Sequence, residues 1–205
     1  MTLLEELIAR EYFEKNGFFI KRLDLAVEST SNSKFAPIPL TSYFLQRETG
    51  RTKNQDLPDR FQLFSSDVGG LALGTLTIVP WQSSGLSLQI FQSPTRYRSW
   101  IRNTVCPSIS PIQEAVKGQK LPVESLPILL LPGIPAHDPH RKDIVELLQK
   151  SGIKAIFTLR TLLESLIHQI DTHSHTPDSA LSEILKLLSV YDLISPPQLD
   201  LFDDL

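Results

Sequence analysis

The stretch that decides the fold runs from residue 127 to residue 170. It opens with Pro127-Ile128-Leu129-Leu130-Leu131, a continuous apolar run of strand length that Pro132-Gly133 closes. An amphipathic segment over roughly His140 to Lys150 predicts a helix, and residues 153–158 after it predict a second strand. A further helix is expected over roughly residues 160–170. The order strand, helix, strand, helix indicates neighbouring parallel strands with a crossover helix, and therefore an α/β fold.

The composition fits one compact domain with a short tail. The chain has 205 residues, and its hydrophobic fraction of 41% is enough to build a core and excludes global disorder. No apolar run approaches the length of about 18 residues that a membrane-spanning helix needs, so we expect no membrane insertion. Because Pro196-Pro197 stops regular structure, we place the domain at residues 1–195 and the tail at residues 196–205.

Charge and cysteine content limit the classes of function. The 20 basic and 23 acidic residues give a net charge of −3, which argues against a nonspecific coat on DNA but leaves room for a local basic groove. The single cysteine, Cys106, can form neither an internal disulfide nor a zinc site built on thiolates, and we expect it to be a filler or an exposed thiol. Glu5 and Glu6 stand where a secretory signal would carry basic residues, so we expect a cytoplasmic protein.

The first half of the chain predicts less regular structure. A helix is expected over roughly residues 2–15, with an apolar face made by Leu3, Leu4, Leu7, Ile8 and Phe13. After Asn16-Gly17, residues 18–23 predict a strand. Residues 29–60 predict a loop insertion, partly ordered around residues 38–40 and 43–45. Leu76 to Val79 predicts a buried strand that Pro80 stops.

Helices are also expected between and after these strands. Short helices are predicted near residues 96–103 and 111–117. A last helix is predicted over roughly residues 177–190, with Thr176 as its cap. Its apolar stripe would consist of Leu181, Ile184, Leu185 and Leu188.

This order of elements resembles the PD-(D/E)xK nuclease-like fold. The resemblance rests on residues 11–22, on Ser66-Asp67, on the strand ending Val79-Pro80-Trp81, and on residues 127–170. It implies a restriction-endonuclease-like domain, in which a small mixed central sheet is flanked by helices. In that fold an Asp at a strand end and an acidic residue on the next strand hold a divalent metal, and a Lys two positions further on helps to activate water.

The resemblance assigns Asp67 as the first acid and Glu6 as the assisting acid of the first helix. The second strand departs from the pattern, because Thr77-Ile78-Val79 stands where Glu-x-Lys is expected. This favours a scaffold that has lost its catalytic pair and needs no cofactor. One alternative is an active Mg²⁺- or Mn²⁺-dependent nuclease whose second acid is Glu28, Glu114 or Glu124. Another is that Asp67 is a turn residue before Gly69-Gly70.

The tail carries a pentapeptide, Gln198-Leu199-Asp200-Leu201-Phe202, that resembles the motif by which proteins bind the bacterial sliding clamp. The resemblance implies that Leu201 and Phe202 enter an apolar cleft of the clamp, and that the Gln198 amide bonds its rim. The preceding prolines reduce the entropy cost of ordering an extended peptide. The alternative is that the peptide packs on its own domain near Leu187, Tyr191 and Ile194, which would make the chain a structural or regulatory module.

Two further groups of residues have a functional and a structural interpretation. One interpretation is that basic residues contact a nucleic acid while Tyr97 and Trp100 stack on bases; the other is that they form solvated faces with Trp100 buried. They are Arg47, Arg51, Lys53, Arg96, Arg98 and Arg102. Histidines and acids could hold zinc, although their places before and between helices favour capping and connecting roles. They are His137, Asp138, His140, Asp171, His173 and His175.

Overall fold

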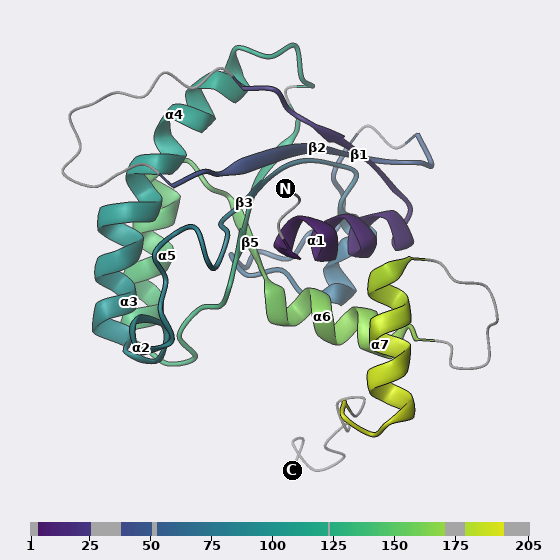
Figure 1. The fold of residues 1–205 in the computed structure, drawn as a ribbon. Coiled ribbons are helices and arrows are strands. Elements are labelled where there is room, and N and C mark those ends of the chain that lie inside the picture. The colour runs from purple at the N-terminus through teal and green to yellow at the C-terminus, as the bar shows by residue number, and fades with distance from the viewer. Residues whose placement is uncertain (1–3, 26–37, 51–52, 123, 171–178, 195–205) are drawn as a thin grey trace, which may run out of the picture.

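A computed structural model of the chain describes residues 4–25, 38–50, 53–122, 124–170 and 179–194. Within these residues a five-stranded mixed sheet lies between two layers of helices (Figure 1). The strands stand in the sheet in the order of the sequence. They are β1 (Phe18–Arg22), β2 (Thr41–Arg47), β3 (Leu73–Ile78), β4 (Leu126–Leu131) and β5 (Ala155–Thr158).

The pairing of neighbouring strands changes from antiparallel to parallel at β3. Strands β1, β2 and β3 pair antiparallel, whereas β3, β4 and β5 pair parallel. The parallel pair predicted for residues 127–131 and 153–158 is therefore confirmed, and so is the expectation of a small mixed sheet flanked by helices. Because β3, β4 and β5 run the same way, their carboxyl ends meet at one edge of the sheet.

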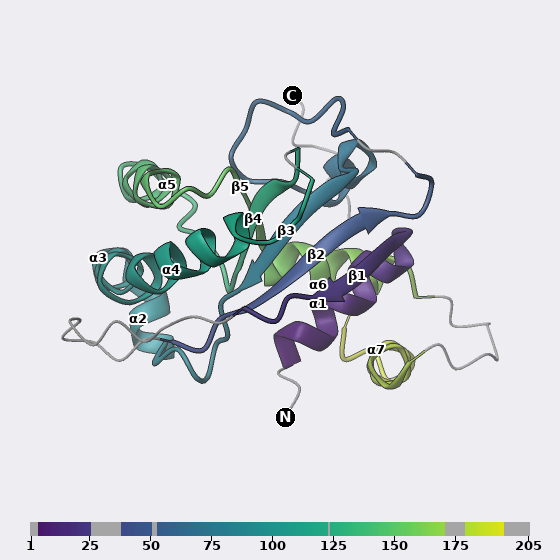
Figure 2. The same ribbon diagram turned by 90° about the horizontal axis from the view of Figure 1, so that it is seen from above.

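Helices cover both faces of the sheet (Figure 2). One face carries α1 (Leu4–Lys15), α6 (Leu159–His168) and α7 (Ala180–Val190). The other carries α2 (Leu88–Gln92), α3 (Pro94–Trp100), α4 (Cys106–Lys117) and α5 (His140–Lys150). Each layer buries its own apolar cluster against the sheet, and the fully buried side chains include Phe13 and Phe157 on the first face and Ile109 and Leu129 on the second. No helix in the described part of the chain combines the length and the apolar character needed to cross a bilayer.

The predicted loop insertion at residues 29–60 contains a full strand around residues 43–45, where only partial order was expected. Strand β2 lies there and pairs with β1 on one side and with β3 on the other. Tyr43 and Leu45 point into the core, but Thr41 and Ser42 are also buried. The buried hydroxyls break the apolar–polar alternation that is typical of a strand.

Helix α1 faces the core with a different side from the one predicted. Leu4 is 63% exposed and Leu7 is 37% exposed, whereas Glu5 and Glu6 are only 7% and 4% exposed. Ile8 and Phe13 are buried, as their spacing indicates. The helix is turned because both carboxylates accept hydrogen bonds inside the domain, which lowers the cost of burying them.

Two other helices also differ from expectation. The two short helices predicted between residues 96 and 117 are one helical stretch, in which a wider π-type turn at Ile101–Val105 joins α3 to α4 just before Pro107. Helix α7 begins at Ala180, and its cap is Ser179, whose Oγ accepts the Ser182 amide at 3.0 Å. The predicted cap, Thr176, lies outside the described residues. Ile184, expected on the buried stripe, is 54% exposed.

Candidate functional site

Asp67 serves the fold of its own segment. It lies in a short 3-10 helix, Ser65–Gly70, between β2 and β3. Both carboxylate oxygens are 2.7 Å from Nη2 of Arg60, and one of them accepts the Phe64 amide at 2.7 Å. The residue therefore holds a turn, as the structural interpretation of Ser66-Asp67 expects. A guanidinium stands where a catalytic carboxylate would need a metal.

Glu6 is satisfied by hydroxyl groups of the sheet. Its Oε1 accepts the Thr41 hydroxyl at 2.7 Å, and its Oε2 accepts the Tyr43 hydroxyl at 2.9 Å. Burial, with a further contribution from the Glu6 carboxylate, raises the pKa of Tyr43 to about 12. The neighbouring Glu5 accepts the Trp81 amide at 2.7 Å. These two carboxylates tie α1 to β2 and to the end of β3.

Strand β3 carries no charge at the positions where Glu-x-Lys was expected. Thr77 is buried and stands opposite Ser42 of β2, and their hydroxyl oxygens are 3.1 Å apart. Val79 follows the strand and is also buried. A pair of neutral hydroxyls, from Ser42 and Thr77, thus stands between β2 and β3 at the position where the resemblance expects an acid.

The other acids considered as metal ligands are engaged elsewhere. Glu114 pairs with Lys117 at 3.2 Å, and Glu124 pairs with Lys53 at 3.5 Å. Glu28 lies outside the described residues. In the part of the chain that the structure describes, no three His, Cys, Asp or Glu side chains are placed to hold a metal ion. The residues present there do not fit the two-acid divalent site that the resemblance implies.

In the histidine-containing segment before α5, the acidic residue is also paired with a basic side chain. Asp138 pairs with Lys142 at 2.8 Å, and the hydrogen bond from that ammonium lowers the pKa of Asp138. This contact joins the segment to the first turns of α5. Asp171, His173 and His175 lie outside the described residues. Cys106 is half-buried, and burial raises the pKa of its thiol.

Two of the described basic residues are engaged inside the fold. Arg47 donates to the carbonyls of Leu71, at 2.9 Å, and of Val68. Arg98 pairs with Asp143 of α5 at 3.2 Å, while Arg102 is exposed. Arg51 lies outside the described residues.

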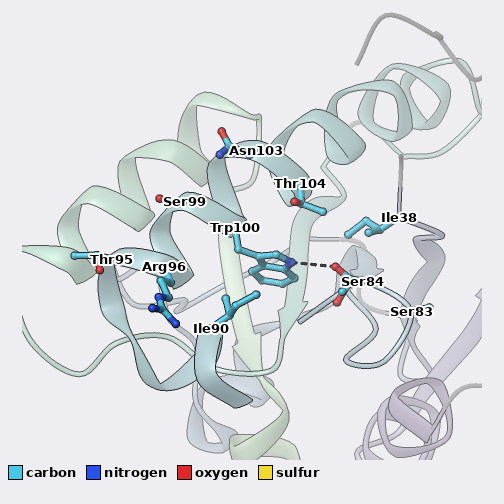
Figure 3. A pocket seen from close by; sticks show the side chains of 11 residues that line it. Ile38, Ser83, Ser84, Ile90, Thr95, Arg96, Ser99, Trp100, Asn103 and Thr104 are labelled. Carbon is cyan, nitrogen blue, oxygen red and sulfur yellow. Dashed lines mark hydrogen bonds between the residues drawn. The ribbon is translucent and has the colours of Figure 1, made fainter. Parts of the chain in front are cut away.

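The aromatic residues beside these arginines are core residues. Tyr97 is 1% exposed and donates to the Gly133 carbonyl at 2.6 Å, and Trp100 is 7% exposed. Figure 3 shows Trp100 donating its indole N–H to the Ser84 carbonyl, at 3.0 Å, inside a cavity of about 720 Å³ that Arg96 also lines. A buried ring cannot stack on a base, so the structure favours the solvated-face interpretation for this helix.

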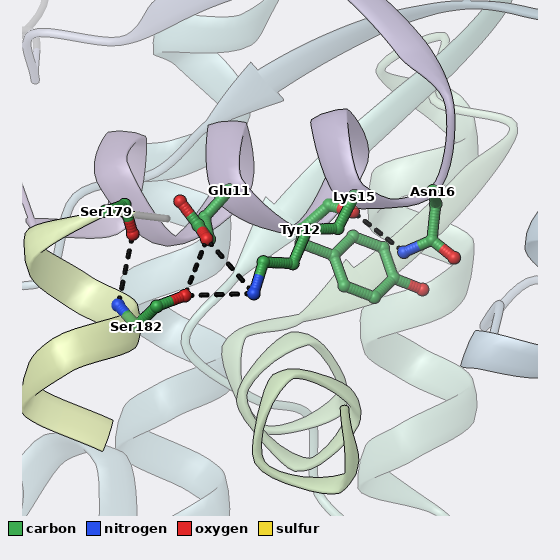
Figure 4. Close-up of polar contacts among 6 residues, drawn as sticks. All are labelled: Glu11, Tyr12, Lys15, Asn16, Ser179 and Ser182. Atoms are coloured by element: carbon green, nitrogen blue, oxygen red, sulfur yellow. Dashed lines mark hydrogen bonds and ion pairs between the residues drawn. The ribbon is translucent and has the colours of Figure 1, made fainter. Parts of the chain in front are cut away.

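A polar cluster joins α1 to α7 (Figure 4). The Ser182 hydroxyl donates to Glu11 at 2.8 Å and accepts from the Lys15 ammonium at 2.9 Å. The same ammonium is 3.4 Å from the Glu11 carboxylate. Because Ser182 and Glu11 are both buried, this cluster fixes the last described helix against the first one.

A further cavity lies at the carboxyl edge of the parallel strands. We call it the carboxyl-edge cavity; its volume is about 780 Å³. It is lined by Trp81 after β3, by residues 132–136 after β4, and by Thr158 and the partly exposed side of α6 after β5. Gly133 has no space for a side chain there, since an added Cβ would lie 2.8 Å from the Phe91 ring.

The sequence analysis did not find this cavity, although a signal for it exists. In α/β sheets ligands bind outside the carboxyl ends of the strands. The residues that follow the two predicted parallel strands could therefore have been considered together. They include Arg160, which pairs with Glu164 at 2.6 Å, and Arg141 of α5, which donates to Gln62 at 3.0 Å.

Comparisons of the chain with family models, with curated proteins and with solved structures found no match.

Proposed function

We propose that the chain is a noncatalytic, restriction-endonuclease-like protein of bacterial DNA replication or repair that docks on the sliding clamp through Gln198 to Phe202. The observation that carries the noncatalytic part is the state of the two candidate acids. Asp67 is bound by Arg60, and Glu6 is bound by two hydroxyls of β2. Among the described residues, no hydrogen bond or ion pair connects either carboxylate to a second acid.

Metal chemistry explains why this matters. Mg²⁺ sheds part of its water shell only where carboxylates and substrate phosphates supply enough negative charge. The Arg60 guanidinium neutralises Asp67 and would repel a cation at the same oxygens. On β3, Thr77 has no carboxylate and Val79 has no ammonium. The mixed sheet preceded by α1 supports the resemblance to the nuclease-like scaffold, and the loss of these groups supports a binding role.

The clamp-docking part rests on the pentapeptide. Its two apolar side chains at Leu201 and Phe202 suit an apolar cleft, and the amide of Gln198 suits its polar rim. Peptides of this length bind with dissociation constants on the order of micromolar, about −8 kcal/mol, which suits reversible recruitment. DNA would then be reached through the clamp, which agrees with a net charge of −3.

Binding of the full chain to a purified bacterial clamp tests this part. We expect Leu201→Ala/Phe202→Ala to weaken binding by at least about a hundredfold, because two buried anchors each contribute about 1.5–3 kcal/mol. The matched control is Asp203→Ala/Asp204→Ala, which leaves the pentapeptide intact and should change affinity by less than about threefold. A full chain that does not bind, or a double anchor variant that binds unchanged, overturns the proposal.

Plasmid cleavage in Mg²⁺ or Mn²⁺ tests the noncatalytic part. We expect no cleavage by the full chain. Metal-dependent cleavage that Asp67→Ala abolishes, and that Glu14→Ala on the exposed side of α1 leaves intact, would show that the acids still act and would overturn this part.

A further inference from the structure

The carboxyl-edge cavity has apolar walls of a kind that bind side chains. The Trp81 and Phe91 rings, with centroids 5.0 Å apart, form one wall. Leu163 and Ile167 of α6 form another. A volume of about 780 Å³ lies within the range of about 300–1,000 Å³ that is usual for ligand sites. The cavity can therefore take a few large apolar side chains.

The charged residues of the cavity favour an acidic ligand. Arg141 and Arg160 line it together with one acid, Glu164, which leaves one positive charge in excess. Arg160 is 84% exposed at its side chain, so its guanidinium stands at the mouth and not in the apolar interior. A peptide with apolar side chains and nearby carboxylates would place the apolar groups between the walls and the carboxylates beside the arginines.

The last residues of this chain have that chemistry. Leu199, Leu201 and Phe202 are apolar, and the segment 195–205 contains three aspartates and no basic residue. We propose that this segment occupies the carboxyl-edge cavity of its own domain when no partner holds it, so that cavity and clamp compete for the same peptide. The competition rests on the proposed function; the docking into the cavity does not.

The end of the described chain lies on the side of the sheet that supplies one wall of the cavity. Ile194, the last described residue, packs against the same apolar cluster as Leu163 and Ile167, which line the cavity. Seven residues lie between Ile194 and Phe202, and the eight residue steps span up to about 26 Å. Docking within one chain requires the cavity to lie within this span of Ile194.

The exposed side of α7 is the competing surface for the same peptide. Ile184, Leu187 and Tyr191 are exposed there at helical spacing. The charges nearby are less suitable, because Glu183 and Asp192 are exposed beside this face and outnumber Lys186, the one basic residue of α7. Charge complementarity therefore favours the cavity over α7.

The two tryptophans report on the two cavities in the full chain. In a ¹⁵N-labelled sample each indole N–H gives one resonance. Trp81 lines the carboxyl-edge cavity, whereas Trp100 is held by Ser84 in the other cavity (Figure 3). We expect Leu201→Ala/Phe202→Ala to shift the Trp81 resonance and to leave the Trp100 resonance in place. A peptide of residues 195–205 added to this variant should return Trp81 to its original position, and the peptide with both alanines should not.

A charge variant tests the mouth of the cavity. Arg160→Ala should move the Trp81 resonance towards its position in the anchor variant, whereas Arg102→Ala, an exposed arginine on the opposite face, should not. Arg160→Ala should also strengthen clamp binding by about threefold or more, because apparent affinity rises with the fraction of free tail. A shift that depends on protein concentration would assign the occupant to a second copy and would overturn docking within one chain.

Each proposal fails by a different result. If the Trp81 resonance is the same with and without the anchors, or if α7 resonances move in its place, docking in the cavity is wrong even where the clamp binds. If Trp81 responds as expected and the clamp does not bind, docking in the cavity stands and the proposed function is wrong.

Discussion

Replacing Glu6 tests whether its carboxylate stabilises the fold. Glu6 accepts two buried hydroxyls, from Thr41 at 2.7 Å and from Tyr43 at 2.9 Å. A hydrogen bond to a charged group contributes about 1.5–3 kcal/mol, and each buried hydroxyl left without a partner costs about 1–3 kcal/mol. Since water would partly fill the space of a lost side chain, we expect Glu6→Ala to lower the free energy of unfolding by about 3 kcal/mol.

Glu6→Gln should have an intermediate effect. Its amide keeps one oxygen acceptor for one of the two hydroxyls, so we expect a loss of about 1–2 kcal/mol. Glu14→Gln is the matched control on the same helix. Glu14 is 49% exposed at its side chain and pairs with Arg10 at 3.2 Å, so its loss should cost about 0.5 kcal/mol or less.

Urea unfolding of the three variants, monitored by circular dichroism, measures these values. For a chain of this length the Glu6→Ala loss corresponds to a fall in Tm of about 6–12 °C. A double-mutant cycle with Tyr43→Phe should give a coupling of about 1 kcal/mol or more, because the two side chains share one hydrogen bond. If Glu6→Ala were as stable as Glu14→Gln, the two hydrogen bonds would not stabilise the fold and the structural role assigned to Glu6 would be refuted.

Three further predictions concern other parts of the fold. Asp67→Ala should lower stability by about 1–2 kcal/mol in urea, since the Arg60 pair and the Phe64 amide both lose their partner; an unchanged midpoint contradicts this. Ser182→Ala should speed amide exchange in α7 by about fivefold, equivalent to about 1 kcal/mol, with no change in β4, and equal acceleration in both would deny a local role. Burial raises the pKa of Tyr12 from 10.0 to about 12, so the neutral phenol stabilises the fold fully below about pH 10 and this contribution is lost as pH rises towards 12. Unfolding free energies from about pH 9 to about pH 11.5 should therefore fall, with a smaller fall in Tyr12→Phe, and parallel curves for the two proteins would contradict the assignment.

The elements that the sequence predicted well are those with contiguous local signals. Residues 127–131 lie within β4, and helix α5 has the predicted bounds. In these segments apolar residues either run continuously or recur at helical spacing, so the pattern itself shows which side is buried. The tail pentapeptide is local in the same sense, and its interpretation stays a prediction.

The elements that the sequence missed depend on distant partners. Glu6 is buried because Thr41 and Tyr43, 35 and 37 residues away, donate to it. Strand β2 is an inner strand because β1 and β3 pair with both of its edges, although Thr41 and Ser42 break the alternation typical of a strand. A pattern of residue types cannot specify a hydrogen bond between segments whose approach is set by the rest of the core.

The amino-acid sequence alone determined the α/β class, the parallel pair β4–β5 at one edge of the sheet and the absence of Glu-x-Lys before Pro80-Trp81, because each is written in consecutive residues. The tertiary structure alone decided that Asp67 pairs with Arg60, that Thr77 faces Ser42, and that the ends of three strands enclose a cavity. Each of these features joins segments that are far apart in the chain. The positions of those segments relative to one another are set by hydrophobic burial on both faces of the sheet.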